Sequence, residues 1–333
     1  MAIFSALADG MRRVNRAPAV LLGVWAMTAL ISLPLALAVR ESVAQHLGAS
    51  LSADRVASGV NYDWMQEFAD QATGPGSTLK PTVLGFGAVL DNLSGFLDNT
   101  TRPAIVAGVA AAYVLLWIFL AGGILNRYAR DHPTRAHGFF SASGVFFFRF
   151  LRLAAVQWLV YTFLFGWMHP WLFDRLFRTM TRDLTVERDA FFVRLTLYIV
   201  FGLVLVACNI VFDYAKVRAV VEDRRSALGA IPAAARFIGR NYAGAVTLYL
   251  LNVGLFLIAI GMYAAVAPPA GTTGAPMWIA FIVSQLYIAG RLWVKLTFWA
   301  SETALFQQRL AHAGYVAQPE PVWPESPAAD AIV

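Results

Sequence analysis

Charged residues are scarce in this chain of 333 residues. Only 14% of the residues are Asp, Glu, Lys or Arg, whereas roughly a quarter are charged in soluble globular proteins. Hydrophobic residues make up 59% of the chain, and the mean hydropathy is +0.60. This composition excludes an ordinary soluble enzyme and predicts a polytopic membrane protein.

Cysteine and lysine are almost absent. The one cysteine, Cys208, excludes an internal disulfide and a cysteine-based metal cluster. Lysine occurs at positions 80, 216 and 295 only, and the other 23 basic residues are arginines. Together with abundant Ala, Gly and Val, this indicates GC-rich coding and a bacterial source.

The motifs that carry familiar chemistry are also missing. The sequence contains no His-Glu-x-x-His zinc motif, no phosphate-binding loop of the Gly-x-x-x-x-Gly-Lys-[Ser/Thr] type, and no paired aspartates at helical spacing within an apolar run. His132 and His137 are five residues apart, so on a helix they point to different faces. We therefore predict no catalytic residue, no cofactor and no metal site.

Six apolar runs are long enough to cross a bilayer, which requires about 20 helical residues. The first, between Arg16 and Arg40, resembles a signal peptide, but its 23 uncharged residues exceed a signal core of roughly 7 to 15 residues. We interpret it as an anchor. The fold class predicted is all-α, a membrane helical bundle forming a single domain over 1–312. The expected spans are 17–39, 103–126, 152–173, 194–213, 242–266 and 277–299.

The last two spans form a neutral hairpin. No charge occurs between Asn241 and Gly290, and Pro268-Pro269 with the Gly and Thr residues that follow predicts a tight turn. After the last span, residues 313–333 are rich in proline. We expect them to form a disordered cytoplasmic tail.

Basic residues lie mainly on one side of these spans. The amino-terminal side receives 17 of the 26 basic residues and 9 of the 20 acidic ones. By the positive-inside rule, both termini are predicted to be cytoplasmic, in the bacterial inner membrane. The net charge of +6 therefore records topology and does not indicate a nucleic-acid partner.

The segment 40–102 is the only large external loop. Val43, Leu47, Leu51 and Val56 recur near helical spacing, and 83–97 is apolar. We expect two or three short helices packed on the outer face of the bundle. The alternative is a docking surface for another membrane or envelope protein, because loops of this length are often functional.

Two cytoplasmic segments are amphipathic and share a construction. Each begins with Tyr-Ala and a basic residue, at Tyr128 and Tyr214, and ends in paired arginines before the next span, which suggests an internal duplication. We interpret both as interfacial helices, and the sharper hypothesis is recognition of anionic lipid headgroups. The candidate interfacial contacts are Arg149, Arg152, Arg236 and Arg240.

The sixth span carries a polar stripe. Arg291, Lys295 and Glu302 lie within about 40° of one another at 100° per residue. The two cations are expected to extend to the cytoplasmic interface. The alternative is that they face Asp213 on the fourth span, as a charge cluster that binds a headgroup or lines a path. The other polar residues in spans are expected to join neighbouring helices by hydrogen bonds: Gln157, His169, Asn209, Asn252 and Gln285.

The run from Asp213 to Ser226, with Arg236 to Asn241 entering the next span, resembles six-span bacterial membrane proteins of unknown function. It is also similar to the membrane domain attached to some glycerophosphodiester phosphodiesterases. The resemblance covers about forty residues. No phosphodiesterase domain occurs among these residues, so the resemblance implies a membrane module associated with envelope or lipid processes.

The leading hypothesis is a non-enzymatic membrane module or partner of an envelope complex, surrounded by the lipid bilayer. A small permease or channel that uses the sixth-span stripe is the alternative. Few prolines lie within the first five spans, Pro34 among them, whereas transporters often break their helices near the midplane, which weighs against this alternative. A membrane-embedded enzyme is the third reading, since carboxylates and histidines do not cluster.

Overall fold

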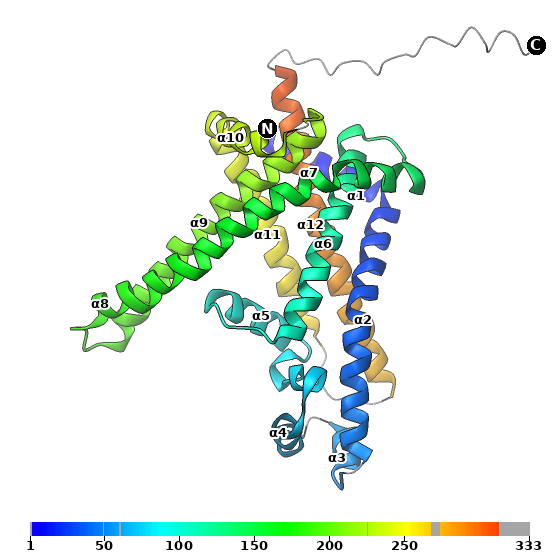
Figure 1. The fold of residues 1–333 in the computed structure, drawn as a ribbon, viewed down its shortest axis with the longest axis vertical. Coiled ribbons are helices and arrows are strands. Elements are labelled where there is room, and N and C mark those ends of the chain that lie inside the picture. The colour runs from blue at the N-terminus through cyan, green and yellow to red at the C-terminus, as the bar shows by residue number, and fades with distance from the viewer. Residues whose placement is uncertain (1, 49, 60, 225, 268–273, 313–333) are drawn as a thin grey trace, which may run out of the picture.

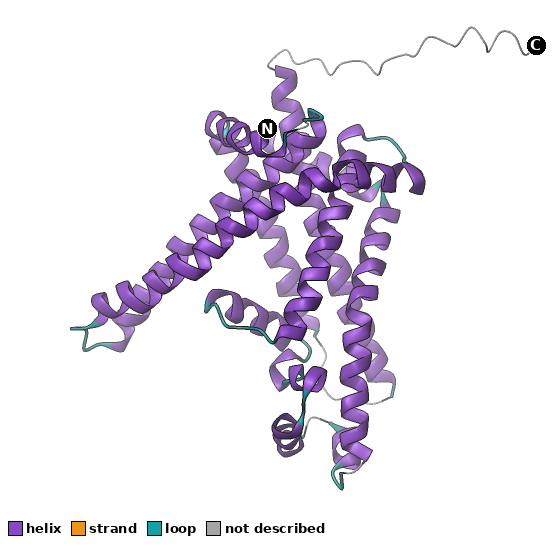
Figure 2. Ribbon diagram, in the orientation of Figure 1, coloured by secondary structure: helices purple, strands orange, loops and turns teal. Residues whose placement is uncertain are grey.

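The computed structural model describes residues 2–48, 50–59, 61–224, 226–267 and 274–312. These residues are almost entirely helical and include no strand (Figure 2). Six helices are long and apolar enough to cross a membrane, which confirms the predicted all-α bundle. They are α2 (Pro18–Gly48), α6 (Ala104–Arg130), α7 (Ala136–Phe163) with its continuation to Thr181, α9 (Glu187–Val221), α11 (Tyr242–Val266) and α12 (Ala275–His312).

The third long helix begins earlier than the sequence suggested. α7 starts at Ala136 and continues through two π-helical segments, η3 (Leu164–Met168) and η4 (Trp171–Leu176), into α8 (Phe177–Thr181). Pro170 lies between the π segments, whose wide turns accommodate a residue without an N–H. No proline interrupts 136–163, and the first segment predicted to be interfacial forms the first half of this helix.

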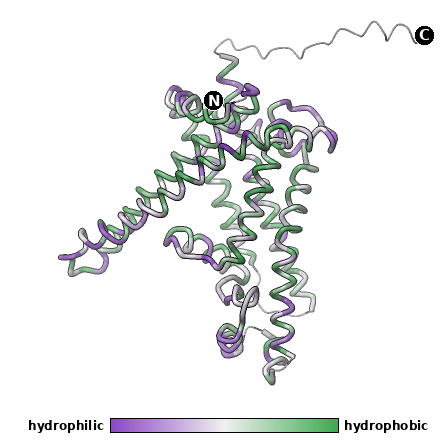
Figure 3. Tube along the Cα trace, viewed as in Figure 1, coloured by the Kyte–Doolittle hydropathy of each residue, from purple (hydrophilic) through white to green (hydrophobic). Residues whose placement is uncertain are grey.

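Three amphipathic segments gather at one end of the bundle, which we call the α1 end (Figure 1). They are α1 (Ala2–Asn15), the start of α7, and α10 (Ala227–Arg240), and the last turns of α12 lie beside them. Ser226 caps α10 by accepting a hydrogen bond from the Gly229 N–H. Figure 3 shows polar residues concentrated at the ends of the molecule and apolar residues along the long helices.

Helix α1, which was not predicted from the sequence, docks against α12. A Cβ placed at Gly10 would lie 2.6 to 2.7 Å from the backbone of Ser301, so the two helices are in direct contact there. Arg13 donates hydrogen bonds to the Tyr128 carbonyl at 2.6 Å and to Gln307 at 2.8 Å. α1 therefore joins the ends of α6 and α12.

The segment 40–102 folds into short helices at the opposite end, as expected. They are α3 (Ala53–Ser58), α4 (Tyr62–Gln71), two 3₁₀ turns, η1 (Gly74–Thr78) and η2 (Pro81–Val83), and α5 (Gly87–Leu97). Trp64, Met65 and Phe68 are buried against Val43 and Leu47 of α2, which extends nine residues past its predicted end. The Trp64 indole N–H donates to His46 Nδ1 at 3.0 Å.

α7, α8 and α9 form an antiparallel hairpin that inclines away from α6 and α11 (Figure 1). Its distal half has its own small core. The Asn99 side-chain amide donates to the Phe165 carbonyl at 2.9 Å, and the Asp98 carboxylate accepts from Arg194 and Tyr198 of α9. The end of α5 is thereby tied to the hairpin.

α11 and α12 pack side by side as the predicted hairpin. The rings of Tyr263 and Tyr287 stack with centroids 4.2 Å apart, and Asn252 donates to Ser301 Oγ at 2.9 Å. The central part of the predicted turn, 268–273, and the predicted tail, 313–333, lie outside the described residues.

Candidate functional site

A cavity of about 570 Å³ lies between five helices, α6, α7, α9, α11 and α12. Its wall is largely aromatic and apolar, and includes the rings of Trp117, Trp158 and Trp299. All five helices are of membrane-spanning length, so the polar groups in the wall are set inside the bundle. They are Gln157, Tyr161, Asn209, Asp213, Lys216, Tyr249 and Lys295.

Asp213 and Lys216 form an ion pair on α9. Lys216 Nζ lies 2.9 Å from Asp213 Oδ1, and the two side chains are only 20% and 18% exposed. The Trp299 indole N–H donates to the same oxygen at 3.3 Å, and Lys216 also lies over the Trp299 ring. The spacing i, i+3 brings the pair together on one helical face, and α12 holds it from the other side.

Lys295 on α12 enters the cavity against an aromatic wall. Its Nζ lies 3.4 Å from the centroid of the Trp117 ring, with Tyr113 and Trp299 also within 6.0 Å. A desolvated ammonium on a tryptophan face gains about 2 kcal/mol from the ring quadrupole. Lys295 therefore faces inward, toward the helix that bears Asp213, as in the alternative arrangement considered from the sequence.

Arg291 does not join this cluster. It is exposed and lies outside the cavity wall, one turn before Lys295. Glu302, the third member of the stripe, is 1% exposed, and neither of its carboxyl oxygens has a hydrogen-bond partner among the described residues. The three residues of the stripe thus lie in different surroundings: Arg291 is exposed, Lys295 lines the cavity, and Glu302 is buried.

The four interfacial arginines also separate. Arg149 is paired with Asp223 at 2.6 Å, donates a further hydrogen bond to the Arg224 carbonyl at 3.3 Å, and is 17% exposed in its side chain. Arg152, Arg236 and Arg240 are exposed at the α1 end. Arg149 therefore links α7 to the turn after α9, whereas the other three remain available to a membrane surface.

Three of the other polar candidates bond to neighbouring elements. The His169 ring nitrogen Nε2 lies 2.8 Å from the Leu97 carbonyl, and the Trp25 indole N–H donates to Gln285 at 3.2 Å. Asn252 donates to Ser301 on α12. These contacts match the structural role expected for amides and a lone histidine in spans.

Gln157 and Asn209 line the cavity, and Asn209 also joins two helices there, because it accepts a hydrogen bond from the Tyr161 hydroxyl of α7. The cavity aromatics and Lys216 were not predicted from the sequence as site residues. The sequence does hold a signal for the aromatic residues. Tyr113 and Trp117 are four residues apart, as are Lys295 and Trp299, so each pair lies on one helical face.

Among the described residues no group of three or more His, Cys, Asp or Glu side chains is placed to hold a metal ion. Comparison with protein-family models, curated proteins and solved structures found no match to this chain. The chemistry available to the cavity is thus that of two lysines, one aspartate, amides and aromatic rings, which suits binding of an anion.

Proposed function

We propose that this protein is a non-enzymatic module of the bacterial inner membrane that binds the anionic headgroup of an amphiphile in the cavity between α6, α7, α9, α11 and α12. The observation that carries this proposal is the placement of two lysines against a single aspartate in an aromatic wall. The resemblance to membrane domains associated with envelope and lipid processes supports the same conclusion.

The charge of the wall favours an anion. Asp213 is already engaged by Lys216 and by the Trp299 indole. Lys295 has aromatic neighbours at short range but no ion pair in the described part of the chain. The formal charge of the lining is therefore +1, and in a low-dielectric wall an unbalanced charge attracts a counterion strongly.

The lining favours an amphiphile over a small inorganic anion. Most of the wall is apolar, and Trp158 at its edge is exposed. The hairpin of α7 and α9 inclines away from α6, so the apolar surfaces that continue from the cavity would face acyl chains in a bilayer (Figure 1). A headgroup bound beside Lys295 can leave its chains among these helices.

The basic ends of the helices support the proposed orientation. Arg152, Arg236 and Arg240 are exposed at the α1 end, where the positive-inside rule places the cytoplasm and its anionic leaflet. At the other end, α3 to α5 carry exposed apolar side chains such as Tyr62, Leu93 and Phe96. We propose this surface as the contact for another membrane or envelope protein.

Lipid binding by the purified protein tests the proposal. Native mass spectrometry in mild detergent with phosphatidylglycerol or phosphatidylcholine measures the affinity of each. Lys295→Gln should lower the affinity for the anionic lipid about tenfold, because a charge-assisted hydrogen bond contributes roughly 1.5 to 3 kcal/mol to binding. Arg291→Gln is the matched control, since it removes the same charge one turn away on the exposed face.

Equal loss in both variants would show nonspecific attraction to the basic surface and would overturn the proposal. A transport assay separates it from the permease alternative. If liposomes containing the protein move a labelled anionic amphiphile or solute, and Lys295→Gln stops that movement, the chain is a carrier and not a binding module.

A further inference from the structure

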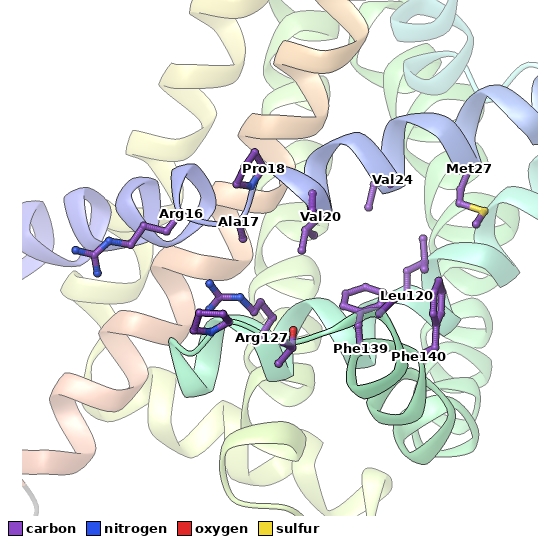
Figure 4. A pocket seen from close by; sticks show the side chains of 15 residues that line it. Arg16, Ala17, Pro18, Val20, Val24, Met27, Leu120, Arg127, Phe139 and Phe140 are labelled. Carbon is purple, nitrogen blue, oxygen red and sulfur yellow. The ribbon is translucent and has the colours of Figure 1, made fainter.

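A second cavity, of about 420 Å³, lies where α2 begins, between α2, α6 and the start of α7 (Figure 4). It uses none of the residues of the first cavity. Arg16 and Arg127 are the charged residues of its wall. Neither arginine takes part in the anion-binding cavity around Lys295.

Arg127 is a buried cation with an unused donor. The residue is 5% exposed, and its Nη1 has no hydrogen-bond partner among the described residues. Figure 4 shows its guanidinium directed from α6 toward the chain at Ala17. An unpaired buried charge costs several kcal/mol, so Arg127 would gain from a negatively charged partner in this cavity.

The charges around the cavity leave a positive excess. The acidic group nearest in the chain is Asp131, one turn after Arg127, and its carboxylate lies 3.8 Å from Arg16. No ion pair joins Asp131 to Arg127 in the described residues. Arg16 and Arg127 thus carry two positive charges against the one negative charge of Asp131, which itself lies outside the cavity wall.

Two helices begin at the wall of this cavity. The wall includes Pro18, Ala19 and Val20 at the start of α2, and Ala136 at the start of α7. Neither helix has an acidic residue in its first turn, and the N-cap of α7 makes no side-chain hydrogen bond. The ends of α1 at Asn15 and of α6 at Arg130 lie at the same corner with dipoles of opposite sign, so the arginines, and not the helix ends, supply the positive charge of the cavity.

The rest of the wall is apolar and runs away from the arginines along α2 and α6. Val24, Met27, Leu120 and Phe140 form it (Figure 4). A free phosphate ion would gain nothing from these side chains, whereas the acyl chain of a lipid would bury its surface against them. The combination favours a phosphate group attached to a hydrocarbon chain.

We propose that this cavity is a second binding site, which holds the phosphate group of an anionic phospholipid between Arg127 and Arg16 and an acyl chain on the surface of α2 and α6. The site rests on different residues from the first cavity, so it stands or falls separately from the proposed function.

The test counts and titrates bound phosphatidylglycerol by native mass spectrometry. Arg127→Gln should reduce the number of bound lipids by one, or lower the affinity for that lipid about tenfold. Arg135 is an exposed arginine at the N-cap of α7 and does not line the cavity. Arg135→Gln should therefore change the affinity for the lipid less than twofold. Lys295→Gln should leave this lipid in place, which distinguishes the two sites.

A second variant keeps the test decisive if Arg127→Gln fails to fold. Gly23 lines the cavity, and a Cβ there would meet nothing within 4 Å, so Gly23→Leu fills the space without a backbone clash. It should displace the lipid. Gly202→Leu, in an equally open helical position on α9, should not.

Two further probes identify the ligand. Inorganic phosphate should compete weakly, and phosphatidylcholine should be retained at least fivefold less well than phosphatidylglycerol. If inorganic phosphate binds as tightly as the lipid, or if phosphatidylcholine is retained equally, the assignment to an anionic phospholipid is wrong. Retention of the lipid by both Arg127→Gln and Gly23→Leu would also overturn it.

Discussion

The ammonium group of Lys295 lies 3.4 Å from the centre of the Trp117 ring, so that a side chain of α12 is held by a side chain of α6. The two residues are 178 positions apart in the chain. Their contact closes one side of the cavity and sets the direction in which the cation points.

A double-mutant cycle should measure this contact. Trp117→Leu and Lys295→Met each remove one partner, and we expect a coupling energy of about 1 to 2 kcal/mol, because the ammonium is desolvated against the ring. Denaturant unfolding of the four proteins in detergent gives the value. Additive effects, within a few tenths of a kcal/mol, would mean that the ring only fills space.

Asp213→Asn should separate stability from binding. Loss of the carboxylate leaves Lys216 without its ion-pair partner and should lower the free energy of unfolding by about 3 kcal/mol. The same change raises the positive charge of the cavity, so the affinity for an anionic amphiphile should rise several-fold. Asp223→Asn, whose side chain is 77% exposed, is the control for a surface ion pair. A weaker affinity in Asp213→Asn would contradict the proposed charge balance.

Glu302→Met should stabilise the protein by about 1 to 3 kcal/mol, because replacing a buried carboxyl by an apolar group of similar volume removes its desolvation cost. No hydrogen bond is lost, since neither oxygen of Glu302 has a partner in the described structure. Ser301→Ala is the comparison, and it should destabilise the protein by about 1 kcal/mol because it removes the bond from Asn252. Thermal unfolding ranks the three proteins, and a lower Tm for Glu302→Met would show that the carboxyl has a stabilising partner.

Gly10→Val should detach α1 from α12, because any Cβ at this position overlaps the backbone of Ser301. The expected result is faster amide hydrogen exchange over Ala2–Asn15 with little change in the six long helices. Gly202→Val is the matched control, since a Cβ there meets nothing within 4 Å. Unchanged protection of α1 in Gly10→Val would show that the two helices can separate at this point without loss of docking.

The link between α5 and α9 should depend on pH. The hydrogen bond from the Tyr198 hydroxyl, assisted by Ser94 and Arg194, lowers the pKa of Asp98 below its ordinary value. A lowered pKa in the folded state means that the stabilisation is complete at neutral pH and is lost as pH falls through the folded pKa, which lies below the ordinary value of an aspartate. Spin labels on α5 and α9 should therefore report a longer and broader distance in acid. Asp98→Asn should show the broad distribution at every pH, and a distribution in this variant as narrow as in the unchanged protein at pH 7 would contradict the prediction.

The six long apolar helices could be predicted from the sequence because an uncharged apolar run of about 20 residues has the length that the hydrocarbon core of a bilayer requires. The sequence predicted a span from 152 with a separate amphipathic segment before it, and the structure joins the two in one helix that begins at Ala136, because Arg149 and Arg152 continue the same helix. α1 was missed because its apolar face is short and is completed only by Ser301 and its neighbours on α12.

The candidate site was only partly visible in the sequence. Spacing alone placed Arg291 and Lys295 on one face, but a small rotation of α12 decides that Lys295 enters the cavity and Arg291 remains exposed. The second cavity left no local signal. Arg127 looks like any basic residue at the end of a span, and its burial depends on α2 and α7 packing around it.

The distal half of the α7 to α9 hairpin has a core of its own, made by Leu164 and Leu172 of one arm and Leu197, Phe201 and Leu205 of the other. These side chains do not belong to the main core at the α1 end. Such a unit can lose its packing while the rest of the bundle keeps it. When single molecules are pulled out of a bilayer, we therefore expect this hairpin to be extracted as a separate step in the force record.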